Sequence, residues 1–224
     1  CARPAAYSRG RVYDAPPWPL RHHHCRSALA LYFEQVWQQG DDPFGYRSRW
    51  YEARKRDLLL AALPRPLFER GWEIGCANGE LTRKLAERCQ ALLGTDLNPR
   101  AVAVARERCT GLRHVELRCM EHPREWPDGR FDLVVVGEMG YYLDDTALKA
   151  FANRIETSLE RNGVLLACHW RHGFDARRSD TVGVHARLAA LPGLHRIAHY
   201  RDGDFLLDGW SGDATSVGQR EGLR

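Results

Sequence analysis

Apolar residues recur at helical spacing in two stretches near the start of the chain. The first stretch begins at about Ala28, and its apolar repeat consists of Leu29, Tyr32, Phe33, Val36 and Trp37. A segment over 41–46 that is rich in Asp, Pro and Gly predicts a turn. A second helix is predicted over about Trp50–Leu63, and Pro64 ends it. The pattern therefore predicts two helices ahead of the main body of the chain.

Beyond residue 70, short apolar runs alternate with helical segments. One helix is predicted over Leu81–Arg88, and another begins at Pro99 with Asn98 as its N-cap. A third, longer helix has an apolar face that consists of Leu148, Phe151, Ala152, Ile155 and Leu159. Strands are predicted over the apolar runs Trp72–Ile74, Ala91–Thr95, Val115–Arg118, Phe131–Val136 and Gly163–Ala167. Such alternation predicts a parallel sheet with helices on both faces.

The C-terminal part departs from this alternation. A helix over Val182–Leu191 precedes two strands, His195–Tyr200 and Phe205–Trp210, which are joined through the turn pair Asp202-Gly203. An antiparallel hairpin that closes a parallel sheet is typical of class I methyltransferases, whereas dinucleotide dehydrogenases usually lack it. The predicted fold is therefore α/β, a Rossmann-like class I methyltransferase fold. It has a mostly parallel seven-stranded sheet, a C-terminal antiparallel hairpin and two N-terminal helices.

The length of 224 residues suits one well-filled core rather than two full-sized domains. We expect one domain over 28–213, a poorly ordered arm over 1–27 and a tail over 214–224. The arm contains His22–Cys25, which we interpret as an adventitious metal binder, so no metal site is predicted. The chain begins with Cys1 rather than Met, which is compatible with a fragment, a processed product or part of a fusion.

The net charge, the apolar runs and the cysteine spacing indicate which binding partners and which cellular compartment to expect. The net charge of +4 is small and no basic stripe with interleaved aromatics occurs, so no nucleic-acid partner is expected. No apolar run approaches the roughly 20 residues that cross a bilayer, and no signal-peptide pattern follows the first arginines, so we expect a cytoplasmic protein without a membrane partner. Seven cysteines without a C-x-x-C pair indicate free thiols in a reducing compartment. The oligomeric state stays open.

The most informative motif is the loop Glu73-Ile74-Gly75-Cys76-Ala77-Asn78-Gly79, where a predicted strand turns into a helix. Gly75 and Gly79 permit positive φ and let the backbone around Cys76 approach a ligand closely. Glu73 stands at the end of the strand, where a carboxylate would repel a pyrophosphate but suits a cation. The methionine moiety of S-adenosylmethionine (SAM) carries an ammonium and a sulfonium. The loop therefore predicts SAM as the cofactor.

Two further acids follow the next two strands. Asp96 comes 17 residues after Gly79, and with its neighbour Leu97 it is predicted to bind the ribose of the cofactor. Glu121 follows the third strand, and its carboxylate or the backbone of His122 is predicted to reach the adenine amino group. The alternative for these acids is that they are solvated residues at strand ends.

Several segments together carry a family resemblance. They are Asp42–Tyr46, Trp50-Tyr51-Glu52 with Arg54-Lys55, Glu73–Gly79, Trp126-Pro127 with Phe131-Asp132-Leu133, Glu138–Leu143, His169-Trp170-Arg171 and Val184-His185. Over about residues 30–210 the chain resembles the nodulation protein S family. Its members include SAM-dependent methyltransferases that N-methylate the terminal amino sugar of a chitooligosaccharide signal. The resemblance implies that the N-terminal helices form a lid over SAM to which Trp50, Tyr51 and Arg54 belong, with burial by packing alone as the alternative for Trp50. Gly140 departs from the pattern, which has a larger apolar residue there, and Gly137 replaces a serine.

The acceptor side of the site is predicted from the segment after the fourth strand. An amine must lose its proton before it attacks the methyl group, and a nearby carboxylate or histidine can accept that proton. Glu138 is the first candidate for holding the amine and taking its proton, with helix capping or an ion pair as the alternative. Tyr141 and Tyr142 offer aromatic faces to a sulfonium or a sugar ring, with core packing as the alternative.

A second polar group, His169-Trp170-Arg171, follows the fifth predicted strand. His169 is the alternative proton acceptor, Trp170 a candidate floor for a sugar, and Arg171 a candidate anchor for an anion. His185 on the next helix is expected to face back toward His169. A structural role is the alternative for each of these four residues.

The sequence thus predicts a SAM-dependent methyltransferase that N-methylates a small amine or an oligosaccharide-like amino sugar. The main alternatives are an O-methyltransferase acting on a sugar or small acid with His169 as base, and a non-catalytic SAM-binding module. A nicotinamide dehydrogenase and a protein arginine methyltransferase are less favoured by the same residues.

Overall fold

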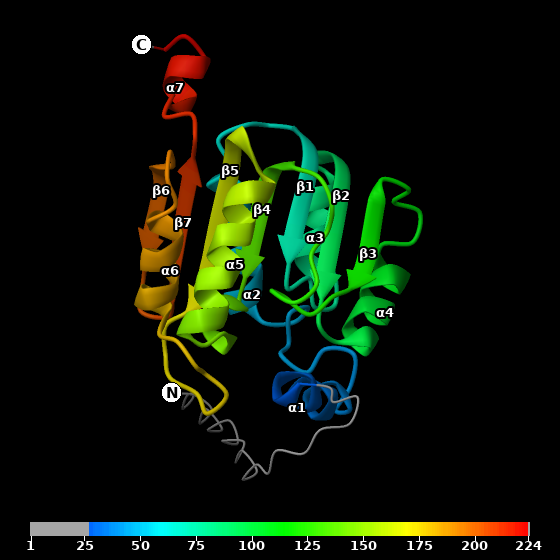
Figure 1. The fold of residues 1–224 in the computed structure, drawn as a ribbon. Coiled ribbons are helices and arrows are strands. Elements are labelled where there is room, and N and C mark those ends of the chain that lie inside the picture. Colours follow the sequence, from blue (N-terminus) through cyan, green and yellow to red (C-terminus); the bar gives the residue numbers. More distant parts are fainter. Residues whose placement is uncertain (1–26, 224) are drawn as a thin grey trace, which may run out of the picture.

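A computed structural model gives the fold of residues 27–223 as a single seven-stranded sheet with helices on both faces (Figure 1). The strands are β1 (Phe68–Ile74), β2 (Cys89–Asp96), β3 (Val115–Cys119), β4 (Phe131–Gly137), β5 (Leu159–Trp170), β6 (His195–Arg201) and β7 (Phe205–Ser211). The helices are α1 (Ala28–Trp37), α2 (Trp50–Ala61), α3 (Glu80–Ala86), α4 (Pro99–Arg108), the 3₁₀ turn η1 (Gly140–Tyr142), α5 (Asp145–Ser158), α6 (Thr181–Ala189) and α7 (Val217–Arg220). The predicted arm over 1–27, with its His22–Cys25 run, lies outside the described residues except for Ser27.

The sheet confirms the predicted fold class. Its strand order is β3-β2-β1-β4-β5-β7-β6, with β1 to β5 parallel and β7 antiparallel to both β5 and β6. Ile74 at the end of β1 pairs with Thr95 of β2 and with Val136 of β4, so the three strands end at one edge. The chain first builds outward from β1 to β3 and then returns to the other side of β1 with β4. Open α/β sheets bind their ligands at such a switch point.

The fifth strand is longer than predicted, because it runs from Leu159 to Trp170 rather than over 163–167. Leu159 was expected on the apolar face of the preceding helix, and that expectation is wrong. Its φ of −84° and ψ of 135° are extended, and it pairs with the start of β4. Leu159 is apolar and buried in either conformation, so its side chain alone does not mark the boundary. His169, expected just after the strand, lies within it.

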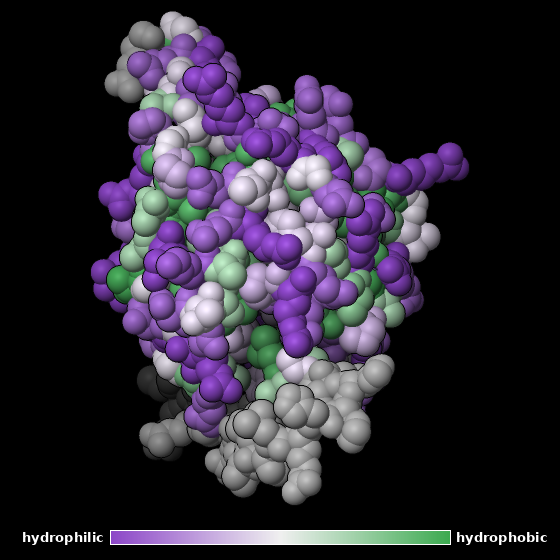
Figure 2. All heavy atoms as spheres, in the orientation of Figure 1, coloured by the Kyte–Doolittle hydropathy of each residue, from purple (hydrophilic) through white to green (hydrophobic). Residues whose placement is uncertain are grey.

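The two faces of the sheet carry separate apolar clusters. One cluster joins β4 to α5 and α6 and includes Val134, Phe151 and Val184. The other joins the opposite face of the strands to α2 and α3 and includes Val135 and Leu85. Successive strand residues point to opposite faces, so each strand contributes to both clusters. On the outside, hydrophilic side chains cover most of the face shown in Figure 2, with apolar ones between them. A third, smaller cluster packs α4 against β3 and includes Val102 and Leu117.

Short polar side chains set the starts of several helices. Asn98 accepts hydrogen bonds from the backbone nitrogens of Arg100 and Ala101, which confirms it as the N-cap of α4. Asp144 caps α5 by accepting from the nitrogen of Ala147 at 2.8 Å. The segment predicted as a tail over 214–224 contains the short helix α7. Among the helices of residues 27–223, none is long and apolar enough to cross a membrane.

The N-terminal segment lies at the carboxyl edge of the parallel strands. Figure 1 shows α1 below the arrowheads of β1, β2 and β3. In the turn between α1 and α2, Asp42 accepts hydrogen bonds from the backbone nitrogens of Tyr46 and Arg47 at 2.7 and 3.0 Å. The same carboxylate accepts a third hydrogen bond, 3.0 Å long, from the side-chain nitrogen of Asn78. This contact ties the predicted lid segment to the glycine-rich loop.

Candidate active site

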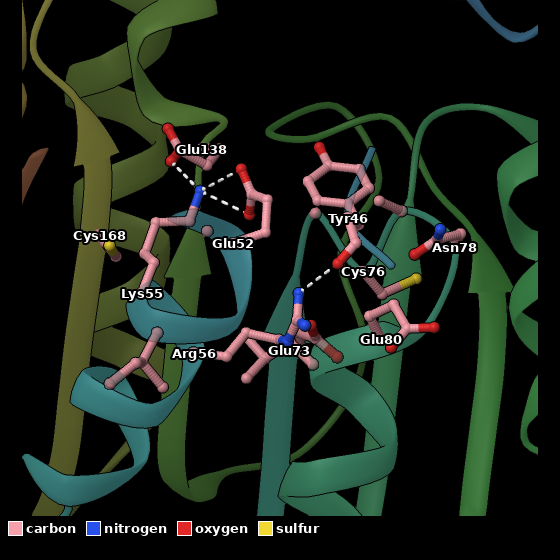
Figure 3. A pocket seen from close by; sticks show the side chains of 15 residues that line it. Tyr46, Glu52, Lys55, Arg56, Glu73, Cys76, Asn78, Glu80, Glu138 and Cys168 are labelled. Atoms are coloured by element: carbon pink, nitrogen blue, oxygen red, sulfur yellow. Dashed lines mark hydrogen bonds and ion pairs between the residues drawn. The ribbon is translucent and has the colours of Figure 1, made fainter. Parts of the chain in front are cut away.

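A pocket opens at the switch point between β1 and β4 (Figure 3). Its walls come from the turn before α2, from α2, from the loop after β1, and from the ends of β4 and β5. The lining residues are Tyr46, Glu52, Lys55, Arg56, Leu59, Glu73, Gly75, Cys76, Ala77, Asn78, Glu80, Leu81, Gly137, Glu138 and Cys168. The pocket thus brings together the predicted cofactor loop and the predicted acceptor residue Glu138.

The backbone around the pocket adopts unusual conformations. Gly75 has a φ of 85°, and a Cβ there would lie 2.5 Å from the carbonyl oxygen of Gly137. Only glycine therefore lets this loop approach the end of β4. Within residues 27–223, two non-glycine residues have positive φ, Ala77 at 45° and Glu138 at 53°. Both line the pocket. Strain of this kind, of about 1–3 kcal/mol per residue, clusters at functional sites.

Glu73 lies at the inner end of the pocket and is almost completely buried. Its carboxyl group accepts a 2.5 Å hydrogen bond from the hydroxyl of Thr82 on α3. Burial raises the pKa of Glu73 to about 8, and the nearby charge of Asp96 adds to the rise, while the Thr82 hydrogen bond opposes it. A buried acid with a raised pKa is stabilised in its charged form by a cation, which is the ligand chemistry predicted for this position.

Asp96 lies beside this pocket at the end of β2. Its two carboxylate oxygens accept hydrogen bonds from the backbone nitrogens of Ala77 and Asn98, at 3.0 and 2.8 Å. Burial raises the pKa of Asp96, and the backbone donors oppose that rise. The carboxylate thus braces the glycine-rich loop, whose second glycine, Gly79, has a φ of 81°. Asp96 and Leu97 do not line the pocket itself, and their contact with ribose stays a prediction.

The segment after β3 places its two candidate residues away from the pocket. The imidazole of His122 is buried between Trp72 and Trp126, with Nε2 2.9 Å from the hydroxyl of Thr95. Burial lowers the pKa of His122 to about 4, so the ring is neutral. Glu121 faces Arg124 at 3.5 Å. The adenine contacts predicted for Glu121 and the His122 backbone remain predictions.

Two thiol groups, those of Cys76 and Cys168, line the pocket. Burial raises the pKa of the Cys76 thiol well above its usual value, so the thiol stays protonated. The cysteines within residues 27–223 are free thiols, at Cys76, Cys89, Cys109, Cys119 and Cys168. In the same part of the chain, no group of three or more His, Cys, Asp or Glu side chains is placed to hold a metal ion.

Glu138 is the most heavily hydrogen-bonded carboxylate of the pocket. One oxygen accepts from Lys55 Nζ at 2.7 Å, and the other accepts from the hydroxyl of Tyr141 and the backbone nitrogen of Trp170, each at 2.7 Å. Lys55 also lies 3.0 Å from Glu52, so its ammonium is held between two carboxylates (Figure 3). Burial disfavours the charged Lys55, but the attraction of Glu138 and Glu52 outweighs it and holds the pKa of Lys55 well above its usual value.

Comparison with known proteins relates this chain to methyltransferases. A family model described as a methyltransferase domain matches residues 72–163. The solved structure of a Pseudomonas syringae protein assigned as a methyltransferase is 43% identical, with a TM-score of 0.64 over 73% of this chain and 99% of that chain. This chain belongs to the class I methyltransferase family. Its members use SAM, and membership sets aside the dehydrogenase alternative.

The resemblance to nodulation protein S is also confirmed for this methyltransferase. The structure of the N-methyltransferase NodS from Bradyrhizobium japonicum WM9, in complex with S-adenosyl-L-homocysteine (SAH), is 26% identical. Its TM-score is 0.72, covering 81% of this chain and 97% of that chain. Nodulation protein S from Rhizobium tropici is 33% identical over 108 residues. That match covers 48% of this chain and 45% of the relative, so the chain spans about half the length of the curated relative.

Helix α2, which contains Trp50 and Arg54, is called the lid helix here. The face of this helix that lines the methyltransferase pocket does not include these two residues. Trp50 is 75% exposed, and Arg54 donates a 2.7 Å hydrogen bond to Asp202 in the turn between β6 and β7. Neither Trp50 nor Arg54 lines the pocket, and their contact with SAM stays a prediction. The face that lines the pocket is spaced i, i+3, i+4 and i+7, and consists of Glu52, Lys55, Arg56 and Leu59. This helical spacing is the signal by which Lys55 could have been found.

The remaining acceptor-side candidates separate into two groups. Tyr141 and the backbone of Trp170 contact Glu138, as described above. Tyr142 packs against the aromatic rings of α1, and Arg171 donates to carbonyl oxygens in the turn between β6 and β7. Tyr141 and Trp170 thus contact a residue of the methyltransferase pocket without lining it, whereas the side chains of Tyr142 and Arg171 contact other parts of the chain.

His169 is fully buried within β5, and both of its ring nitrogens have partners inside the protein. Nε2 accepts a hydrogen bond from the backbone nitrogen of Gly140 at 3.1 Å. Nδ1 lies 3.0 Å from Nε2 of His185, which faces it from α6 as expected. Neither nitrogen is available to a substrate in this arrangement. The geometry therefore favours Glu138 over His169 as the group that meets the acceptor.

Proposed function

We propose that this methyltransferase moves the methyl group of SAM to the nitrogen of a small amine or amino sugar, with Glu138 holding the acceptor and taking its proton. One observation carries the proposal. In the pocket, the Glu138 carboxylate already binds an ammonium group, that of Lys55, at 2.7 Å. A site that holds a buried ammonium between two carboxylates has the charge and the hydrogen-bond acceptors that a protonated amine requires.

The pocket fits the cofactor on the chain's own geometry. Gly75 lines the pocket and Gly79 lets the loop pack closely against Ala105 of α4, while the buried Glu73 offers a carboxyl group to a cation. Glu73 would hold the ammonium of SAM, the glycine-rich loop would approach its methionine moiety, and Asp96 would bind its ribose. When bound, SAM supplies an electrophilic methyl group.

The residues of the chain then have defined tasks. The charged form of an amine has no lone pair, so the amine must be deprotonated in the pocket. Glu138 accepts this proton, while Tyr141 and the Trp170 backbone hold its second oxygen in place. The strained φ of Glu138 fixes the direction in which its carboxylate points. Lys55 must give up its contact with Glu138 when the acceptor enters, and Glu52 remains as its partner.

The nitrogen acceptor is supported by the likeness to NodS, which is an N-methyltransferase. An amino sugar is supported by the aromatic side chains at the same edge of the sheet. The ring of Trp170 packs edge to face against that of Tyr51, with 5.3 Å between the ring centroids, and the Trp170 backbone nitrogen donates to Glu138. Aromatic faces of this kind suit a sugar ring.

The test is a methyl-transfer screen with isotope-labelled SAM over amines, amino sugars and hydroxyl acceptors, followed by mapping of the methylated atom. We expect transfer to nitrogen, with a chitooligosaccharide that bears a free terminal amine among the acceptors. Transfer only to oxygen would replace the proposal with the O-methyltransferase alternative. SAM binding without transfer to any acceptor would favour the non-catalytic module.

A further inference from the structure

We infer that His169, His185 and Asp208 form a positioning chain that fixes the backbone of Gly140 and, through it, the Glu138 segment. This inference rests on the proposed role of Glu138. None of the three residues lines the pocket, so they do not touch the reacting groups. They come from β5, α6 and β7, and all three are buried.

Three hydrogen bonds make up this positioning chain, which begins at the Gly140 backbone and ends at Asp208 on β7. The backbone nitrogen of Gly140 donates to His169 Nε2 at 3.1 Å. His169 Nδ1 lies 3.0 Å from His185 Nε2, and His185 Nδ1 lies 2.7 Å from one oxygen of Asp208. The other oxygen of Asp208 contacts His199 Nδ1 at 2.7 Å on the neighbouring edge strand.

The polarity of these bonds allows one arrangement of protons. Because the Gly140 backbone can only donate, Nε2 of His169 must be the acceptor and its proton must sit on Nδ1. That proton is donated to Nε2 of His185, which must then carry its own proton on Nδ1 and donate it to Asp208. Both histidines are therefore neutral, with the proton on Nδ1 in each ring.

The charges around the chain agree with this arrangement. Burial, together with the charges of Lys55 and Arg177, holds the pKa of His169 well below its usual value, so its ring is neutral. Burial disfavours the charged form of Asp208, but hydrogen bonds from His185 and His199 outweigh it and keep its pKa below the usual value. An ionised Asp208 can only accept, and it therefore sets the direction of the whole chain.

The contact at the other end is tight. Gly140 begins η1 two residues after Glu138, and a Cβ on Gly140 would lie 2.6 Å from Val184 Cγ1 and 3.0 Å from His169 Nε2. Glycine at this position is what lets the backbone reach the imidazole. Glu138 itself has a φ of 53°, a conformation that persists only when the surrounding structure imposes it. The hydrogen bond from Gly140 to His169 is one such constraint.

Two substitutions at His185 separate the hydrogen-bond chain from simple packing. His185→Gln keeps one acceptor for His169 and one donor for Asp208, whereas His185→Leu fills space without either. We expect His185→Leu to lower kcat by roughly 10- to 100-fold, the scale of a small misplacement at a reacting centre, with SAH affinity little changed. His185→Gln should restore most of the rate. His114→Leu is the control. It removes one hydrogen bond between a histidine next to β3 and the Ala86 carbonyl, and it should not change kcat.

The second measurement is the nitrogen-15 NMR spectrum of the histidine rings in the wild-type enzyme, which needs no acceptor. We expect His169 and His185 both neutral with Nδ1 protonated at neutral pH. A protonated His185, or a His169 with its proton on Nε2, would overturn the chain, even if His185→Leu failed to fold. Equal loss of rate in both His185 variants would also overturn it. Full activity of Glu138→Gln, by contrast, would contradict the proposed function while leaving the ring tautomers as found.

Discussion

Replacing Glu138 with glutamine is the sharpest test of the proposed chemistry. Every partner of this carboxylate in the pocket is a donor, namely the ammonium of Lys55, the hydroxyl of Tyr141 and the backbone nitrogen of Trp170. An amide keeps the size of the side chain but must turn its NH2 group toward one of these donors. In either orientation, Glu138→Gln therefore loses at least one hydrogen bond as well as the charge and the basicity.

The expected magnitudes differ for binding, folding and rate. Loss of one charge-assisted hydrogen bond should lower the free energy of unfolding by about 1.5–3 kcal/mol. Removal of a general base should lower kcat by roughly 100- to 10,000-fold, or about 3–5 kcal/mol of barrier. The affinity for SAH should change little, because Glu138 is proposed to meet the acceptor rather than the cofactor. For an amine acceptor, part of the lost rate should return at higher pH, where more of the amine is already deprotonated.

The assay combines initial rates across pH with SAH binding by calorimetry. Glu52→Gln is the matched control, because Glu52 contacts the same ammonium of Lys55 but comes from the lid helix. We expect Glu52→Gln to lose much less rate than Glu138→Gln. His169→Gln tests the alternative base. If His169→Gln abolished transfer while Glu138→Gln kept nearly full activity, the assignment of Glu138 would be refuted and oxygen acceptors would be favoured.

Three further predictions follow from the same geometry. Asp96→Ala should raise the Kd for SAH by roughly 10- to 100-fold in calorimetry, because it removes the proposed ribose acceptor and frees the backbone nitrogens of Ala77 and Asn98; an unchanged Kd would reject the ribose placement. SAH affinity should rise with pH up to about 8, by as much as about tenfold per unit, because burial raises the pKa of Glu73 to about 8 and its carboxyl must ionise to bind the ligand's ammonium. Glu73→Gln should bind weakly and lose that pH dependence, and a pH dependence that survives in this variant would contradict the assignment. Gly140→Ala should lower the free energy of unfolding by about 1–3 kcal/mol in thermal or chemical denaturation, because its Cβ would press on Val184 and His169; unaltered stability would show that η1 can shift freely.

The fold could be predicted because its strands carry strong local signals. Val134, Val135 and Val136 form a continuous apolar run, and all three are buried, as expected for a central strand covered on both faces. The hairpin could be predicted from Asp202-Gly203, and Asp202 does accept hydrogen bonds from the backbone nitrogens that follow it. The boundary at Leu159 could not be predicted, because an apolar residue fits the end of α5 and the start of β5 equally well.

The site was only partly predictable, for a physical reason. The glycine-rich loop has a fixed spacing, so Glu73 and Gly75 could be placed at the pocket from the sequence. Lys55 could not, because an isolated lysine is normally exposed and its burial depends on Glu138, which lies 83 residues away. Which face of α2 meets the pocket is decided by how the helix docks, and this docking turns Arg54 toward Asp202 instead.

Gly140, a departure from the nodulation protein S pattern, lies between the Glu138 segment and the buried His169. The resemblance to nodulation protein S leads us to expect a larger apolar residue at this position, but a Cβ there would lie 2.6 Å from Val184 Cγ1 and 3.0 Å from His169 Nε2. The backbone nitrogen of Gly140 donates a hydrogen bond to a buried imidazole, which in turn contacts His185 and, through it, Asp208. A hydrogen bond has a preferred length and direction, so this series of bonds restricts where the Gly140 backbone can lie. We therefore expect buried polar side chains to help hold the Glu138 segment of this methyltransferase in place.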